Sequence, residues 1–218
     1  MRDDRDVAGR PGPTRTQDAE GTRRNILDVA TEEFAGKGYS GGRIDEIAAR
    51  TNTSKRMIYY YFRDKEGLYL AVLEEAYRRI RSIENTLDLE HLEPEEALKA
   101  LVGFTFDYQN ENQDFIRLVM VENIHHGEHL KKSRAIHDVN ATVIDKIKGL
   151  YQRGVAAGVF RKGIDPIDIH MSISALCFFN VSNRATFSLI FERDMDSSKA
   201  LAKRRAIVVE TILKYVRA

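Results

Sequence analysis

The feature that most constrains this chain is a pair of short helical patterns with only a brief turn between them. The first pattern covers residues 44–51 and the second covers residues 55–61, where Ile58 and Phe62 are predicted to turn inward. Ser54 is placed to cap the second helix, because its hydroxyl can accept a free backbone N–H of the first turn. This spacing is typical of the helix-turn-helix, in which the second helix enters the major groove of DNA.

The outward side chains of the second helix have an unusual composition. They are predicted to be Lys55, Arg56, Met57, Tyr59, Tyr60 and Tyr61. Tyrosine hydroxyls can bond phosphate oxygens, tyrosine rings can pack on thymine methyl groups, and the cations can meet phosphates or guanine edges. This face therefore favours DNA binding. Partly buried packing is the competing interpretation, and it is strongest for Tyr61, which neighbours Phe62.

The cations of this region supply a modest local charge. Residues 43–65 hold six cations and three acids, a local charge of +3 in a chain whose formal net charge is only +1. Affinity for DNA must therefore come from this patch, and nonspecific binding should be weak and sensitive to salt. Lys65 follows the predicted cap Asp64, at a helix N-terminus whose free amides attract a phosphate.

Helical periodicity also dominates the rest of the chain. An apolar face at 26–34 precedes Gly36 and Gly38, which are predicted to end that helix. Further helices are predicted at 65–80, 97–108, 115–123, 135–157, 167–191 and 200–216. No segment alternates with period two for long enough to indicate a sheet, so the fold is predicted to be all-α.

Single residues mark the ends of several of these helices. Pro94 fits a first helical turn, Asp165 and Pro166 form a cap followed by a first-turn proline, and Gly158 fits a helix C-terminus. The predicted architecture is a three-helix helix-turn-helix head joined by a linking helix to a C-terminal helical bundle, about nine helices in total. Its predicted divisions are an N-terminal arm at 1–20, a DNA-binding head at 21–66 and the remaining body at 67–218.

Residues 1–20 are predicted to form a flexible arm. They are rich in charge and contain two prolines, so they cannot bury enough apolar surface to become ordered alone, and they lack the apolar run of a signal peptide. Gly9-Arg10-Pro11 is similar to the minor-groove core of an AT-hook. Arg10 and Arg15 could reach a neighbouring minor groove, as basic arms do elsewhere. A solvated tail is the competing interpretation.

The stretch RIDEIAARTNTSKRMIYYYFRDKEGL, from Arg43 to Leu68, resembles the N-terminal signature of the tetracycline-repressor (TetR) family. With the preceding helix, the resemblance covers about residues 22–73. It implies a homodimeric, ligand-responsive transcriptional regulator, usually a repressor. By position, it assigns DNA contacts to Arg43, Lys55, Arg56, Met57, Tyr59, Tyr60, Tyr61 and Lys65. Arg43 and Met57 stand where the family often has threonine, so the operator sequence cannot be copied from a relative.

The body carries weaker signals. Residues 115–124 are apolar nearly all round and predict a buried helix, and polar residues within such a core either satisfy the structure or orient a ligand. The candidate ligand-binding residues are Phe104, Tyr108, Met120, Glu122, Asn123, His126, Asn140, Ile144 and Phe178. Core packing is the alternative for each of them. Residues 112–127 are similar to the corresponding helix of a TetR subgroup related to the pyrimidine-utilisation regulator, which implies a small-molecule pocket among the middle helices.

The last two predicted helices carry apolar stripes that suit subunit pairing. The candidate interface residues are Ile169, Ile173, Leu176, Phe179, Ile207, Val208, Thr211, Ile212 and Tyr215. The family implies a four-helix bundle made of two such helices from each subunit. A symmetric dimer also places two short reading helices on a palindrome, which doubles the DNA contacts. The alternative is that both stripes pack within one monomer.

His125 and His129 lie four residues apart with Glu122 one turn earlier, a spacing that could hold a metal ion on a helix. Gly127 interrupts the helix between the two histidines, so surface or capping histidines are favoured. No Ser-His-Asp order and no phosphate-binding glycine loop occurs. The sequence therefore predicts no catalytic activity and no cofactor.

One cysteine, Cys177, excludes an intrachain disulfide and favours a reducing compartment. The longest apolar stretch, 167–181, is too short to span a bilayer. These features predict a cytoplasmic protein without a membrane segment.

A repressor released from a palindromic operator by a small molecule is the favoured function. A regulator of the same fold that acts through a protein partner or as an activator is the second, and a helical metal-dependent enzyme is a remote third.

Overall fold

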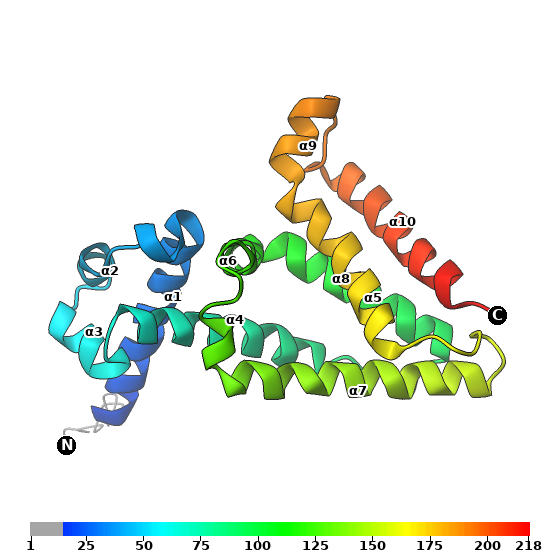
Figure 1. The fold of residues 1–218 in the computed structure, drawn as a ribbon, viewed down its shortest axis with the longest axis horizontal. Coiled ribbons are helices and arrows are strands. Elements are labelled where there is room, and N and C mark those ends of the chain that lie inside the picture. The colour runs from blue at the N-terminus through cyan, green and yellow to red at the C-terminus, as the bar shows by residue number, and fades with distance from the viewer. Residues whose placement is uncertain (1–14) are drawn as a thin grey trace, which may run out of the picture.

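The computed structural model describes residues 15–218, with side chains from residue 19 onward, and this part of the chain is all-helical, as predicted (Figure 1). The head contains α1 (Arg15–Gly41), α2 (Ile44–Arg50) and α3 (Lys55–Phe62), and α4 (Lys65–Glu84) links it to the body. The body contains α5 (Pro94–Glu111), α6 (Gln113–Ile124), the 3₁₀ turn η1 (Leu130–Lys132), α7 (Arg134–Ala156), α8 (Pro166–Ser182), α9 (Arg184–Phe191) and α10 (Ser198–Val216). Figure 1 shows the head at one end, α8–α10 at the other, and α4 and α7 running between them.

The helices begin and end where short polar side chains and glycine dictate. The Ser54 hydroxyl accepts a hydrogen bond from the Met57 N–H at 3.1 Å, and the Asp64 carboxylate accepts one from the Gly67 N–H at 2.7 Å. Gly158 follows the end of α7 with a φ of 74°, a left-handed conformation that glycine adopts readily. These predicted caps are confirmed.

Two predicted helix ends are wrong. Gly36 lies inside α1, and the backbone leaves the helical conformation only at Gly38 (φ 69°, ψ 175°). The single helix predicted at 167–191 is divided at Asn183, whose ψ of 4° separates α8 from α9. Ser182 bonds its neighbour Asn183 at 2.7 Å, and such local side-chain bonding competes with continued helix. The described residues therefore form ten α-helices instead of about nine.

Residues 1–14, which include the predicted minor-groove tripeptide Gly9-Arg10-Pro11, lie outside the described residues. The segment predicted as an arm is helical from Arg15 onward. Helix α1 therefore begins before the predicted arm ends.

The head core extends beyond the head. It contains Phe34, Ile47 and Ile58, and it is completed by Leu118 of α6 and Ile136 of α7. A second core joins α5, α7, α8 and α10. Two helices beyond the predicted boundary after residue 66 therefore contribute buried side chains to the core of the head.

Helix α6 is less buried than its sequence predicted. Ile116, Leu118 and Glu122 are buried, whereas Ile124 is 70% exposed. Leu118 packs in the head core, while Phe115 and Val119 line a cavity in the body. The apolar residues around this helix therefore face either the head core or the body cavity, and its last turn lies at the surface.

Candidate DNA interface and ligand cavity

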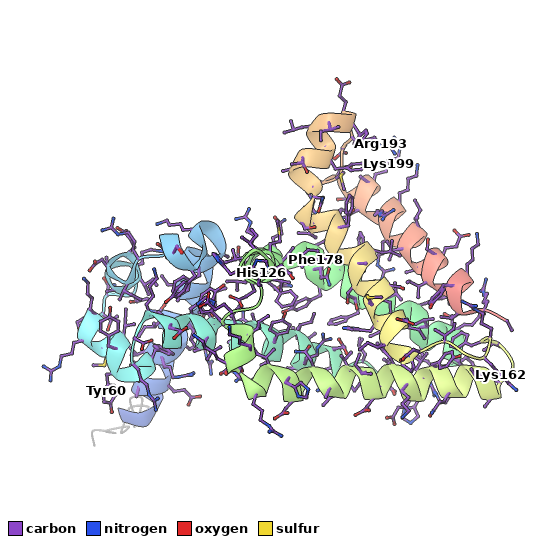
Figure 2. The ribbon with its side chains drawn as sticks, in the orientation of Figure 1. Tyr60, His126, Lys162, Phe178, Arg193 and Lys199 are labelled. Carbon is purple, nitrogen blue, oxygen red and sulfur yellow. The ribbon has the colours of Figure 1, made fainter. Side chains whose placement is uncertain are left out.

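The outer face of α3 presents aromatic and basic side chains to solvent. Lys55 and Arg56 are exposed, and Met57 and Tyr59 are each about two-fifths exposed. Tyr60 is the most open of the set, with 79% of its surface accessible. Figure 2 shows Tyr60 at the outer edge of the head, away from the body. These five side chains form the surface that the sequence predicted for the reading helix.

Tyr61 and Lys65 are half-buried and lie differently from the rest of the predicted contact set. The Tyr61 ring packs near Phe62, with ring centroids 6.1 Å apart, as the packing alternative expected. Lys65 donates a hydrogen bond from Nζ to the Ser40 carbonyl at 3.3 Å and lies over the Tyr39 ring. Lys65 therefore already connects the end of α1 to the start of α4.

Arg43 and Lys55 of the predicted interface each bond an acidic residue of the head. Arg43 is exposed at the N-cap of α2, and its backbone N–H donates to the buried Glu33 carboxylate at 3.1 Å. The Lys37 side chain and this backbone bond lower the pKa of Glu33, against the effect of its burial. Lys55 forms an ion pair with Asp45 of α2 at 2.5 Å. A phosphate would therefore compete with Asp45 for Lys55.

A cavity of about 140 Å³ lies in the body between α4, α5, α6, α7 and α8. Its apolar walls are Tyr77, Ile80, Leu101, Phe115, Val119, Val143, Ile147, Ile173 and Phe178 (Phe178 is labelled in Figure 2). Its polar wall residues are Arg81, Glu84, Thr105, Gln109, His170 and Ser174. A mainly apolar cavity with a few polar groups is the usual form of a small-molecule site.

The charged groups of the cavity satisfy one another. Arg81 and Glu84 are buried and bond each other, and Arg81 Nε also donates to Asn140 Oδ1 at 3.0 Å. Burial, with Arg81 nearby, lowers the pKa of His170 to about 4, so this imidazole is neutral at pH 7. The cavity walls therefore carry no net charge at neutral pH.

One residue that lines the cavity has a buried polar atom without a partner. Gln109 is only 5% exposed, and its Oε1 has no hydrogen-bond partner within the described structure. The hydroxyl of its neighbour Thr105 already donates to the Leu101 carbonyl at 2.9 Å. A buried carbonyl oxygen without a donor is unusual in a folded protein and calls for a partner.

The structure brings few of the predicted ligand-binding residues to this cavity. Phe178 lines it, and Asn140 supports it through Arg81. Ile144 packs against the body core, and Phe104 and Tyr108 line a separate surface hollow.

The predicted ligand residues of α6 and the turn after it point elsewhere. Asn123 and His126 are exposed, the half-buried Met120 does not line the cavity, and Glu122 is buried toward the head. These four residues therefore do not line the cavity, because α6 turns Phe115 and Val119 toward it instead.

Helix α4 supplies a wall of the cavity that was not predicted from the sequence. Tyr77, Ile80, Arg81 and Glu84 all line the cavity. Their spacing of i, i+3, i+4 and i+7 places them on one helical face, which is the signal that was available. The arginine and the glutamate make this face look solvated in sequence, although each is buried by pairing with the other.

A small polar cluster joins the body to the head beside the cavity. The Glu122 carboxylate accepts hydrogen bonds from the backbone N–H groups of His129 and Leu130, and it lies 2.9 Å from His129 Nδ1. The His129 ring packs against Tyr39 and Tyr69 of the head, with centroids 4.4 and 4.8 Å away. The turn after α6 is thereby fastened to α1 and α4.

This cluster also explains the histidine spacing that raised the metal alternative. His129 faces Glu122, whereas His125 is exposed. Within residues 15–218, no group of three His, Cys, Asp or Glu side chains is placed to hold a metal ion. Glu122 and His129 instead stabilise the turn after α6.

The predicted subunit interface divides into two groups. Ile169, Ile173, Val208 and Ile212 are buried within the monomer, where their side chains offer no surface to a partner. Leu176 and Tyr215 are half-buried, and Thr211 is exposed. Phe179 and Ile207 are each about two-fifths exposed and line a surface groove together with Phe187 of α9.

Helix α9, which the sequence predicts as part of one helix over residues 167–191, adds apolar surface. Leu189, Ile190 and Phe191 are 80, 70 and 58% exposed. We call Phe179, Phe187, Phe191 and Ile207 the C-terminal apolar surface. So much exposed apolar area in one region is typical of a protein interface.

Together, the fold and these sites define a helix-turn-helix DNA-binding protein whose helical body contains a small, mainly apolar cavity. Two family models match the chain: "Bacterial regulatory proteins, tetR family" over residues 26–72 and "Tetracyclin repressor-like, C-terminal domain" over residues 94–212. The chain belongs to the TetR family of bacterial transcriptional regulators. Its relatives are regulators and not enzymes, which answers the remote enzyme alternative.

Known proteins match over most of the chain. The transcriptional repressor NicS of Pseudomonas putida is 34% identical over 203 residues, which cover 93% of this chain and 96% of NicS. The solved structure of the putative regulator SCO4942 from Streptomyces coelicolor superposes with a TM-score of 0.68 at 26% identity, covering 89% of this chain and 98% of that one. FadR of Bacillus subtilis, solved with stearoyl-CoA, shares the fold with a TM-score of 0.68 at 18% identity, over 88% of this chain and 97% of FadR.

Similarity to the pyrimidine-utilisation regulator is limited. RutR of Escherichia coli is 36% identical over 61 residues, only 28% of this chain. None of the described helices is long and apolar enough to cross a membrane.

Proposed function

We propose that this protein is a homodimeric repressor in the bacterial cytoplasm that leaves a palindromic operator when a small molecule occupies the body cavity. The similarity to NicS, named as a repressor, extends along nearly the whole of both chains and supports this sign of regulation. The observation that carries the gating is that α4 and α6 each line the cavity and also pack in the head core.

The proposed DNA contacts come from the exposed face of α3 and its flanks. Arg56, Met57, Tyr59 and Tyr60 face the major groove, and Lys55 exchanges Asp45 for a phosphate. The remaining proposed contacts, at the edges of this face, are Arg43, Tyr61 and Lys65. One α3 offers little affinity alone, so the proposed dimer supplies a second copy on the other half of a palindrome.

We expect ligand binding to be communicated to the head through α4 and α6, the two helices that both line the cavity and pack in the head core. In α4, Tyr77 and Arg81 line the cavity, while Leu68 and Val72 lie in the head core two to three turns earlier. A ligand that fits better when α4 and α6 move apart favours that state by its differential affinity. Movement of α4 would then carry the head, and change the separation of the two reading helices across the dimer.

The DNA that lies upstream of the protein's own coding region provides the first test. In nuclease footprinting at low salt, we expect protection of one inverted repeat, and the affinity should fall steeply as salt rises. Absence of a protected inverted repeat at low salt would overturn the proposal. Deletion of the gene should raise transcription from a reporter under this promoter, whereas a fall would favour the activator alternative.

The proposed dimer rests on the C-terminal apolar surface. Phe179→Glu with Ile207→Glu should convert dimers into monomers in analytical ultracentrifugation, because two charges would be buried without partners. Leu92→Glu is the matched control, since Leu92 is also 40% exposed but precedes α5. An unchanged dimer in the double variant would exclude this surface as the interface.

A further inference from the structure

We infer that the effector is an uncharged, ring-sized molecule that donates an O–H or N–H hydrogen bond to Gln109. This inference rests on the proposal that the body cavity is the effector site. Three properties of the cavity carry it: its volume, the balance of its charges, and one unsatisfied acceptor.

Volume limits the effector to about one ring with short substituents. The cavity measures about 140 Å³. An engineered protein cavity of about 150 Å³ holds a benzene molecule, while sites for drug-sized ligands span roughly 300–1,000 Å³. A long acyl chain or a nucleotide therefore does not fit the cavity as it stands.

The shape of the walls favours a flat molecule. The Tyr77 and Phe115 rings meet edge to face, with centroids 5.3 Å apart, and both line the cavity, as does Phe178. Aromatic side chains interact well with another ring in offset or edge-on arrangements.

Charge balance disfavours an ionic effector. Glu84 and Asn140 already bond Arg81, and the neutral His170 adds no charge. The other titratable group that lines the cavity is Tyr77, and burial raises the pKa of its hydroxyl, so it too is uncharged at neutral pH. A carboxylate that pairs with Arg81 would have to displace the buried Glu84 from it. A charge brought into this site without a free counter-charge loses its hydration for little gain.

Gln109 specifies the polar group of the effector. Its Oε1 is buried without a partner, and a carboxamide oxygen can only accept. A ligand hydroxyl or amine would supply the missing donor, while a ligand of the same size without a donor would leave the oxygen unsatisfied. The expected preference is therefore for a phenol-like molecule over its ether or its carboxylate.

Calorimetry of the full chain without DNA tests this with three probes of similar size: phenol, anisole and benzoate. Phenol should bind saturably. Anisole should bind about three- to tenfold more weakly, the usual contribution of one hydrogen bond. Benzoate should bind at least about tenfold more weakly than phenol. Gln109→Leu should bind phenol and anisole equally, whereas Gln113→Leu, an exposed glutamine outside the cavity, should keep the wild-type preference.

Several results would overturn the inference. These are no saturable binding of phenol at millimolar concentration, benzoate or anisole binding as tightly as phenol, or an unchanged phenol preference in Gln109→Leu. Thermal unfolding of each variant confirms that it is folded during the titration. Operator binding in the presence of phenol is measured separately: phenol binding that leaves the operator complex intact contradicts the gating and leaves the ligand class standing.

Discussion

At the scale of single residues, the proposed DNA interface consists of side chains that contribute little to the fold. Tyr60 is largely exposed, and its ring meets the Tyr61 ring with centroids 5.4 Å apart. Lys55 differs, because it pairs with Asp45, and the proposed phosphate contact would replace this ion pair. Substitutions at Arg56 or Tyr60 should therefore change DNA affinity with little change in stability.

Arg56→Ala should weaken operator binding by roughly tenfold or more, as expected for loss of a guanine contact worth about 1–3 kcal/mol. Tyr60→Phe removes a single hydroxyl and should weaken binding by about three- to tenfold. Fluorescence anisotropy with a labelled operator measures both. Arg134→Ala, a 91% exposed side chain at the start of α7, is the control and should bind as the wild type does. Wild-type affinity in both α3 variants would remove this face from the interface.

His170 should make the stability of the protein fall in acid. Its pKa is about 4 in the folded protein and 6.5 when unperturbed, so between these values the unfolded chain binds more protons. The contribution is fully present above about pH 6.5 and is lost as the pH falls toward 4, at most about 3 kcal/mol. Urea unfolding between pH 4 and 7 measures it. His170→Gln should flatten the part of the profile due to this residue, and an unchanged slope would contradict the assignment.

At the scale of helices, the parts that sequence could predict are those decided locally. Ser54, Asp64 and Gly158 each fix a helix end through one backbone bond or one φ angle. The cavity is different, because its walls come from five helices between Tyr77 and Phe178, and their meeting depends on packing. The periodicity of α4 was visible, yet nothing local showed which neighbour its charged face would meet.

The joint between α3 and α4 depends on the absence of a side chain at Gly67. A Cβ there would lie 2.1 Å from the Phe62 carbonyl oxygen, whereas one at Gly36 of α1 would meet nothing within 4 Å. Gly67→Ala should therefore destabilise the protein by about 1–3 kcal/mol through overpacking. Gly36→Ala should stabilise it by up to about 1 kcal/mol, because alanine favours helix. Thermal unfolding compares them, and equal midpoints would contradict a tight joint.

At the scale of the whole molecule, the head is not an independent unit. Leu118 and Ile136 lie at least 50 residues beyond the helix-turn-helix, yet both are buried in its core. The sequence motif ends near Lys65 and gives no sign of this dependence, because the contact is purely tertiary. Changes in the packing of the body can therefore alter DNA affinity even when no ligand is bound.

Leu118→Ala tests this dependence against Leu213→Ala, a similarly buried leucine in the body core. Both should lower the free energy of unfolding by about 2–5 kcal/mol, since each deletes a buried side chain. Well below the unfolding temperature, only Leu118→Ala should speed hydrogen exchange in α1 and weaken operator binding, because its cavity lies against the head. Should Leu213→Ala loosen α1 equally, the two cores would act as one cooperative unit, and α6 would have no special part in carrying the signal.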